Sequence, residues 1–292
     1  MSAPEYRAPE SLDDALSIKR KFGADARVIA GGTDLILRMR DKVFSPKVLI
    51  DLRRLSLATI SCHAGEMHLG AYLTLSQILA SAEIVAVFPA LVEACRPFAG
   101  PPIRNLATLG GNIVNASPAA DLVPPLIAYD ASVALVSSSA NRVLPLLEFF
   151  AGPGKTVMKP DEILTEIRVP LPPPDTAATF TKLGQRQSMA ISIVNLSTRL
   201  TLNEARRVSD VRIVLGSVAP TAMRALAAEA ILRGKELSND QLELAAKVAS
   251  SEISPISDVR SSKDYRRRMT EVLVRRALMA AWDELRGMGC DD

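Results

Sequence analysis

The residues of this sequence that could bind or react gather around two pairs of adjacent glycines. Residues 104–121 read RNLATLGGNIVNASPAAD, so that Gly110-Gly111 leads into asparagine, serine and aspartate. Glycine tolerates positive φ and exposes backbone N–H groups, while the short polar residues add hydrogen-bonding groups. Such a run can hold an anion without large cations. A second pair, Gly31-Gly32, stands far upstream within Ala30–Leu35.

The first glycine pair lies between two predicted elements. Residues 27–30 are typical of a short buried strand and residues 33–38 of the beginning of a helix, which would point free N–H groups toward a phosphate. The alternative is an ordinary turn between a strand and a helix that binds nothing. The full G-x-G-x-x-G fingerprint of a Rossmann dinucleotide site is absent.

Cysteine and histidine do not indicate a metal site in this chain. Cys62, Cys95 and Cys290 are odd in number and widely separated, which disfavours a disulfide framework and a cysteine-ligated iron–sulfur cluster. His63 and His68 lie near Cys62, but these three ligands are fewer than a structural zinc requires. We expect no metal here, and any iron–sulfur chemistry belongs to a partner.

Composition excludes several classes of function. The chain has 292 residues, 48% of them hydrophobic, and a net charge of only +3 from 35 basic and 32 acidic residues. This near-neutral balance does not indicate a basic surface that would bind nucleic acid or an anionic membrane. The N-terminus does not have the pattern of a secretory signal, and no apolar run is long enough to span a membrane. We therefore expect a cytoplasmic protein of two or three domains.

Pro170, Pro172, Pro173 and Pro174 form a stiff extended connector that we take as the main domain boundary. Arg266–Arg268 are expected to form a solvated face of the last helix, since acidic residues are interleaved with them. The predicted helices are 11–23, 74 or 76 through 84, 90–95, 223–232, 240–251 and 263–285. The predicted strands are 48–50, 132–136, 142–145, 162–169, 179–183, 194–202 and 211–218, with a β-hairpin over 60–73.

Over essentially its whole length, the chain resembles the FAD-binding medium subunits of the molybdenum hydroxylases, the family of carbon monoxide dehydrogenase and xanthine dehydrogenase. Four motifs in order carry this resemblance: Ala30–Leu35; Thr108–Asn112 followed by Ser117-Pro118 and Asp121-Leu122; Glu162–Leu164; and Lys182. The resemblance implies an α+β fold of the vanillyl-alcohol-oxidase/PCMH type, with FAD between two subdomains. It assigns residues 1–57 and 58–174 to these FAD-binding subdomains. Residues 175–292 would form a C-terminal domain of a three-stranded antiparallel sheet plus helices.

The resemblance also implies which residues bind FAD. The turn from Arg27 to Leu35 would hold the pyrophosphate through backbone N–H groups, with the Thr33 hydroxyl added. Asp121 would accept a hydrogen bond from a ribose or adenine hydroxyl, and Lys182 would lie near the isoalloxazine, where its charge favours the anionic reduced flavin. The full predicted set is Arg27, Val28, Ile29, Ala30, Gly31, Gly32, Thr33, Asp34, Leu35, Phe98, Ala107, Thr108, Gly110, Gly111, Asn112, Asn115, Asp121, Leu164 and Lys182.

Some of these residues also have purely structural interpretations. Phe98 and Leu164 could be core residues, Asp121 could cap a turn, and Lys182 could lie on a solvated strand edge. No residue of the chain is assigned a catalytic role, since the flavin would do the redox chemistry.

The function implied by the resemblance is electron transfer within a larger complex. A large molybdopterin-binding subunit would oxidise the substrate, a small subunit with [2Fe-2S] centres would relay the electrons, and FAD in this chain would pass them to an external acceptor. A dimer of such heterotrimers is expected. The alternatives are a stand-alone flavin oxidoreductase and a cofactor-less assembly protein of the same fold. The sequence identifies neither the substrate nor the acceptor, which could be NAD, oxygen, a quinone or a cytochrome.

Overall fold

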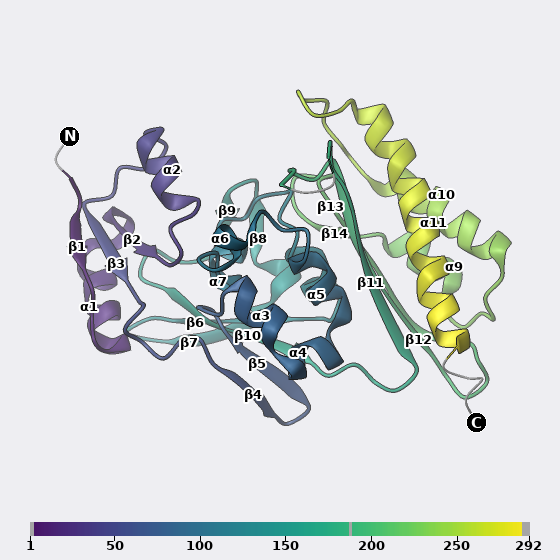
Figure 1. The fold of residues 1–292 in the computed structure, drawn as a ribbon, viewed down its shortest axis with the longest axis horizontal. Coiled ribbons are helices and arrows are strands. Elements are labelled where there is room, and N and C mark those ends of the chain that lie inside the picture. The colour runs from purple at the N-terminus through teal and green to yellow at the C-terminus, as the bar shows by residue number, and fades with distance from the viewer. Residues whose placement is uncertain (1–2, 187–188, 288–292) are drawn as a thin grey trace. The chain divides into compact units, whose positions relative to one another are not determined.

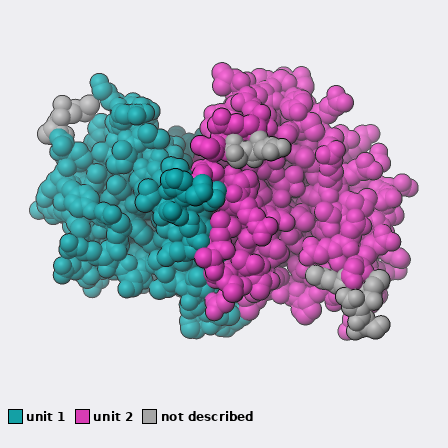
Figure 2. Space-filling model, viewed as in Figure 1, with its two compact units in different colours: residues 1–78, 101–116, 131–170 teal, residues 79–100, 117–130, 171–292 magenta. Residues whose placement is uncertain are grey.

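The computed structural model describes residues 3–186 and 189–287, and these form two compact units (Figures 1 and 2). Unit 1 takes its described residues from 1–78, 101–116 and 131–170, and unit 2 from 79–100, 117–130 and 171–292. Both units combine helices with sheets, so the predicted α+β class is confirmed. The three-part domain division stays a prediction.

Unit 1 contains three sheets. Strands β1, β3 and β2 form a parallel sheet in that order, β4-β5-β10-β6-β7 is antiparallel, and β8 pairs with β9. The strands are β1 Glu5–Arg7, β2 Ala26–Ile29, β3 Val48–Asp51, β4 Ile60–His63, β5 Glu66–Gly70, β6 Ser132–Val136, β7 Asn141–Pro145, β8 Phe150–Gly152, β9 Lys155–Thr156 and β10 Ile163–Pro170. The helices are α1 Leu12–Phe22, η1 Gly23–Asp25, α2 Leu35–Arg40, α6 Pro101–Arg104, α7 Leu109–Val114 and η2 Leu146–Glu148, and α3 Leu75–Ala80 crosses into unit 2.

Helix α1 begins and ends as its sequence predicts. The Ser11 hydroxyl accepts a hydrogen bond from the Asp14 N–H at 3.1 Å, and Gly23 follows the helix with φ of 50°. The apolar side of α1 packs on β2 and β3, where Leu16, Ala26 and Ile50 are buried. This packing fixes the strand that leads into the first glycine pair.

The prediction of one helix from Thr74 or Ser76 through Ile84 is wrong. Helix α3 ends at Ala80, and the Ser81 hydroxyl accepts the Ile84 N–H at 3.3 Å to begin a separate helix, α4. Serine competes with helix continuation because its side chain bonds locally to the backbone.

Unit 2 is built on an antiparallel sheet in the order β11-β12-β13-β14. Helices α9, α10 and α11 lie beside this sheet (Figure 1). Alternate residues of β12 such as Leu196 and Leu200 join the core formed with these helices. The other residues, including Asn195 and Arg199, bond to the segment 117–130. The strands are β11 Thr176–Leu183, β12 Val194–Leu202, β13 Val208–Gly216 and β14 Met223–Arg224. The helices are α4 Ala82–Val87, α5 Pro89–Cys95, α8 Val123–Ala128, α9 Leu226–Leu232, α10 Asn239–Glu252 and α11 Lys263–Gly287.

Strand β14 departs from the sequence prediction. Met223 was expected to begin a helix, but Met223 and Arg224 pair with Leu215 and Val214, and the helix α9 begins only at Leu226. The predicted three-stranded sheet therefore has a short fourth strand at one edge.

The basic run at the start of α11 is not uniformly solvated, contrary to the sequence interpretation. Arg267 and Arg268 are exposed, but Arg266 is only 3% exposed. Its guanidinium donates hydrogen bonds to Ile193 O at 2.5 Å, Ser217 O at 3.0 Å and the Asp258 carboxylate at 2.8 Å. Arg266 thus joins α11 to the ends of two sheet strands.

Candidate cofactor site

The first glycine pair forms the turn that ends β2 in unit 1. Gly32 has φ of 70°, a conformation that favours glycine. Gly31 has a steric requirement instead, because a Cβ there would lie 1.8 Å from the Leu106 carbonyl oxygen. Helix α2 follows, and its first turn has no hydrogen bond from a side-chain cap.

The half-buried Tyr72 holds the strand end before this turn. The Tyr72 hydroxyl donates to Ile29 O at 2.5 Å and lies 3.4 Å from the Asp51 carboxylate. Tyr6 and Arg53 donate to the same carboxylate. Burial raises the pKa of Asp51, but the hydrogen bonds from Arg53 and Tyr6 outweigh it and leave the pKa below its ordinary value. Sequence reasoning missed the two tyrosines, because Tyr72 lies 21 residues and Tyr6 45 residues from Asp51 in the sequence.

The second glycine pair opens helix α7. The Thr108 hydroxyl accepts the Gly111 N–H at 3.1 Å and caps the helix. Backbone hydrogen bonds join this loop to the segment after β5, from Leu109 N to Leu73 O at 2.8 Å and from Gly110 N to Ala71 O at 2.9 Å. A Cβ on Gly110 would lie 2.7 Å from the Ala71 Cβ and 3.1 Å from Leu164 Cδ2.

Unit 1 brings the two glycine pairs side by side. Gly31 meets the backbone of Leu106, and a Cβ on Gly111 would lie 4.0 Å from the Ala30 Cβ. The side-chain oxygen Oδ1 of Asn112 is buried here and has no hydrogen-bond partner among the described residues. The two glycine pairs, 79 residues apart in the sequence, thus form one patch of closely approaching backbone.

The remaining predicted site residues belong partly to unit 2. Arg27–Leu35, Ala107, Thr108, Gly110, Gly111, Asn112, Asn115 and Leu164 lie in unit 1, and Phe98, Asp121 and Lys182 lie in unit 2. The Arg27 guanidinium lies 4.0 Å from the centre of the Phe44 ring. The Asn115 N–H donates to Gly111 O at the end of α7. Leu164 is buried beside Gly110, and Phe98 is half-buried.

In unit 2, Asp121 and Lys182 form a buried ion pair. Lys182 Nζ lies 2.5 Å from Asp121 Oδ2, and their side chains are 11% and 6% exposed. The other carboxylate oxygen accepts hydrogen bonds from Ser192 Oγ at 2.6 Å and Asn195 Nδ2 at 2.8 Å. Sequence reasoning did not assign Ser192 or Asn195 to the site, although Asn195 lies within the predicted strand 194–202. Lys182 is therefore not on a solvated strand edge.

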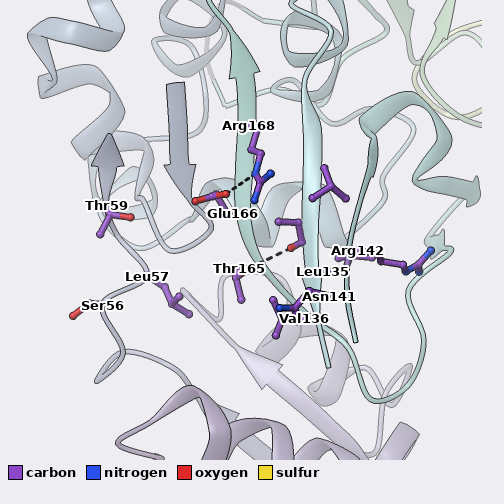
Figure 3. Close-up of a pocket in the computed structure, with 12 residues that line it drawn as sticks. Ser56, Leu57, Thr59, Leu135, Val136, Asn141, Arg142, Thr165, Glu166 and Arg168 are labelled. Atoms are coloured by element: carbon purple, nitrogen blue, oxygen red, sulfur yellow. Dashed lines mark hydrogen bonds and ion pairs between the residues drawn. The ribbon is translucent and has the colours of Figure 1, made fainter. Parts of the chain in front are cut away.

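A separate pocket of about 340 Å³ lies in unit 1 beside β6, β7 and β10 (Figure 3). Its two arginines are already paired, Arg142 with Glu162 and Arg168 with Glu166. None of the predicted FAD-binding residues lines it. The residues that line it are Ser56, Leu57, Thr59, Ala134, Leu135, Val136, Asn141, Arg142, Val143, Thr165, Glu166 and Arg168.

Two further features bear on the kind of site. Within residues 3–186 and 189–287, no three histidine, cysteine, aspartate or glutamate side chains are grouped as metal ligands. None of the helices described there is long and apolar enough to cross a membrane.

Comparison with known proteins matches both parts of the chain. Residues 2–172 match the family described as the FAD binding domain in molybdopterin dehydrogenase, and residues 179–281 match the CO dehydrogenase flavoprotein C-terminal domain. The carbon monoxide dehydrogenase medium chain of Hydrogenophaga pseudoflava is 32% identical over 283 residues, covering 95% of this chain and 96% of that protein. The glyceraldehyde dehydrogenase medium chain of Sulfolobus acidocaldarius is 34% identical over 282 residues, covering 95% and 98%.

Solved structures agree with these matches. A carbon monoxide dehydrogenase from Hydrogenophaga pseudoflava, which lacks the Mo-pyranopterin moiety of the molybdenum cofactor, aligns with a TM-score of 0.92 and 33% identity. That alignment covers 97% of this chain and 98% of the other. The expected family is confirmed: this chain belongs to the FAD-binding subunits of the molybdenum hydroxylases, as an oxidoreductase subunit whose cofactor is FAD.

Proposed function

We propose that this chain holds FAD in a complex with a large molybdopterin-binding subunit and a small [2Fe-2S] subunit. In this role it passes electrons from the iron–sulfur centres to an external acceptor. The relatives support a multi-chain enzyme because they are themselves called medium chains. A dimer of heterotrimers, a cytoplasmic location and the three-part domain division complete the proposal.

The residues of unit 1 fit a dinucleotide cofactor. Two glycine-bearing loops approach each other so closely that a side chain on Gly31 would collide with backbone, which leaves peptide groups rather than side chains on this surface. A pyrophosphate accepts hydrogen bonds from such backbone N–H groups. The unpartnered Asn112 oxygen is a buried acceptor suited to a ligand hydroxyl or amide. This adjacency of the two glycine pairs is the observation that carries the proposal.

Several residues of this chain would hold the cofactor. Peptide N–H groups of Arg27–Leu35 would bind the pyrophosphate, with the Thr33 hydroxyl adding a hydrogen bond. The loop Ala107–Asn112 would lie against the same cofactor, and Leu164 would pack on the rings. Asn115, Phe98, Asp121 and Lys182 complete the proposed set, with Lys182 beside the isoalloxazine. FAD supplies the redox chemistry, since it can exchange electrons with one-electron and two-electron partners. The protein contributes position, charge and exclusion of water.

Purification through an affinity tag on this chain, from cells that make the whole complex, tests the proposal. We expect FAD equimolar with the tagged chain, together with one molybdopterin-containing and one iron–sulfur chain. Recovery of a flavin-loaded chain alone would indicate a stand-alone flavin oxidoreductase. Recovery of the complex with no FAD on the tagged chain would indicate an assembly protein.

A further inference from the structure

A buried ion pair in unit 2 has its charges balanced within the protein. Lys182 and Asp121 are both nearly enclosed, and the pair is 2.5 Å apart. Lys182 lies on β11 directly opposite Asn195 of β12, and Asn195 lies opposite Gly216 of β13. Three neighbouring strands therefore contribute to one small polar cluster.

The neighbours of the pair are arranged to hold the carboxylate. Ser192 and Asn195 both donate to Oδ1 of Asp121, which leaves Oδ2 turned to Lys182. Asn195 also donates to Ala120 O at 3.3 Å. A Cβ on Gly216 would lie only 2.0 Å from the Asn195 side-chain oxygen, so the absence of a side chain there makes room for this amide.

The ends of the strands that carry these donors are themselves fixed. Arg266 donates to Ile193 O, between Ser192 and Val194, and to Ser217 O, next to Gly216. Its own charge is matched by Asp258. Arg266 thus holds the backbone next to Ser192, which lies just before β12, and next to Gly216 at the end of β13.

We propose that Asp121 is the counter-ion of Lys182 and tunes the flavin, with Ser192 and Asn195 as positioning residues that hold its carboxylate. The inference rests on the proposed function, because it takes Lys182 to lie beside the flavin. A cation beside a flavin favours reduction to the anionic form, and a carboxylate paired with that cation cancels part of its field. The paired side chains are buried, so solvent screens this effect weakly.

Midpoint potentials of the flavin in the purified complex test this inference, because the two members of the pair must act in opposite directions. Asp121→Asn keeps the shape but removes the negative charge, and should raise the two-electron potential by about 30 mV, a tenfold change in the reduction equilibrium. Lys182→Met should lower it by a similar amount. In the double variant the potential should return toward that of the unmodified complex.

Matched variants separate tuning from general damage to the sheet. Asp210→Asn removes another carboxylate that is paired with arginines on the same sheet, and Ser197→Ala removes a buried hydroxyl that bonds to Thr179 O. Neither should change the reduction equilibrium more than about twofold. If the Asp121 variant does not fold, Ser192→Ala provides the milder test. The carboxylate is then held less firmly beside Lys182, so the reduction equilibrium should rise by about threefold, in the same direction as for Asp121→Asn.

Three results would overturn the inference. In the first, the flavin potential shifts in the same direction in Asp121→Asn and Lys182→Met. In the second, it shifts in neither variant. In the third, the Asp121→Asn complex folds but has lost its flavin. The last would mean that Asp121 acts by binding the cofactor, as the resemblance implies, and not by tuning its potential. In the first two cases the flavin stays bound and the proposed function survives, whereas an unmodified complex without FAD would defeat the proposed function itself.

Discussion

At the scale of single residues, the candidate site depends on positions where a side chain is not tolerated. Gly31 lies against the Leu106 carbonyl oxygen, at a separation that leaves no room for a methyl group. Two loops that form parts of one binding surface can approach this closely only through glycine. Substitution should therefore disturb folding as well as cofactor binding.

Gly31→Ala should lower the free energy of unfolding by about 3 kcal/mol, because the colliding partner is backbone and cannot rotate away. Urea denaturation measures this effect. Gly287→Ala is the control, since a Cβ there meets nothing within 4 Å, and its effect should stay within about 0.5 kcal/mol. Equal stability of the two variants would show that Gly31 does not lie as close to the Leu106 carbonyl as described.

Lys19 gives a dependence on pH that can be assigned to one residue. Burial lowers the pKa of Lys19 to about 8, with a further contribution from the charge of Arg27, against an ordinary value of 10.5. Charged lysine is thus disfavoured in the folded state, and stability should rise as the pH increases from about 8 toward 10, by up to about 3 kcal/mol. Thermal and urea unfolding across this range would measure the rise. It should be absent in Lys19→Met and retained in the exposed control Lys235→Met.

At the scale of elements, Arg266 joins the long helix α11 to the ends of strands in the sheet of unit 2. Arg266 lies on the same buried stripe as Thr270, Val274 and Ala277, at the spacing of successive helical turns. That spacing can be seen in the sequence, but the neighbouring arginines and the interleaved acidic residues favour the interpretation that Arg266 lies on a solvated face of the helix. The three hydrogen-bond acceptors of Arg266 come from elsewhere in the chain, so no local pattern indicates them.

Arg266→Met should destabilise the protein by about 3 kcal/mol, since it leaves the Ile193 and Ser217 carbonyl groups without their buried donor. Asp258 loses one partner but keeps its hydrogen bonds from Arg260 and Ser261. Arg268→Met, two residues along the exposed side of the same helix, should change stability by less than about 0.5 kcal/mol. Chemical denaturation of both variants decides the matter. Similar small effects in both variants would mean that the hydrogen bonds of Arg266 do not stabilise the attachment of α11 to the sheet.

At the scale of the whole molecule, local sequence signals predicted most elements and the resemblance predicted the family. The helix over 11–23, the hairpin over 60–73 and the strand over 194–202 depend on neighbours in the sequence, so they could be recognised. The division into units could not, because residues 79–100 and 117–130 join the C-terminal part through contacts distant in sequence. The contact of Gly31 with Leu106 and the hydrogen bonds from Ser192 and Asn195 to Asp121 could not be predicted either, because they also join residues that are distant in the sequence.

The central claim is that FAD in this chain carries electrons out of the complex, and selective removal of FAD tests it most directly. Iron–sulfur centres of the complex are first reduced with dithionite, and their reoxidation is then followed after mixing with NAD, oxygen, a quinone or cytochrome c. We predict that FAD-depleted complex is reoxidised at least about tenfold more slowly by the acceptor that the intact complex uses, and that added FAD restores the rate. Reoxidation at the same rate with and without FAD would contradict the account.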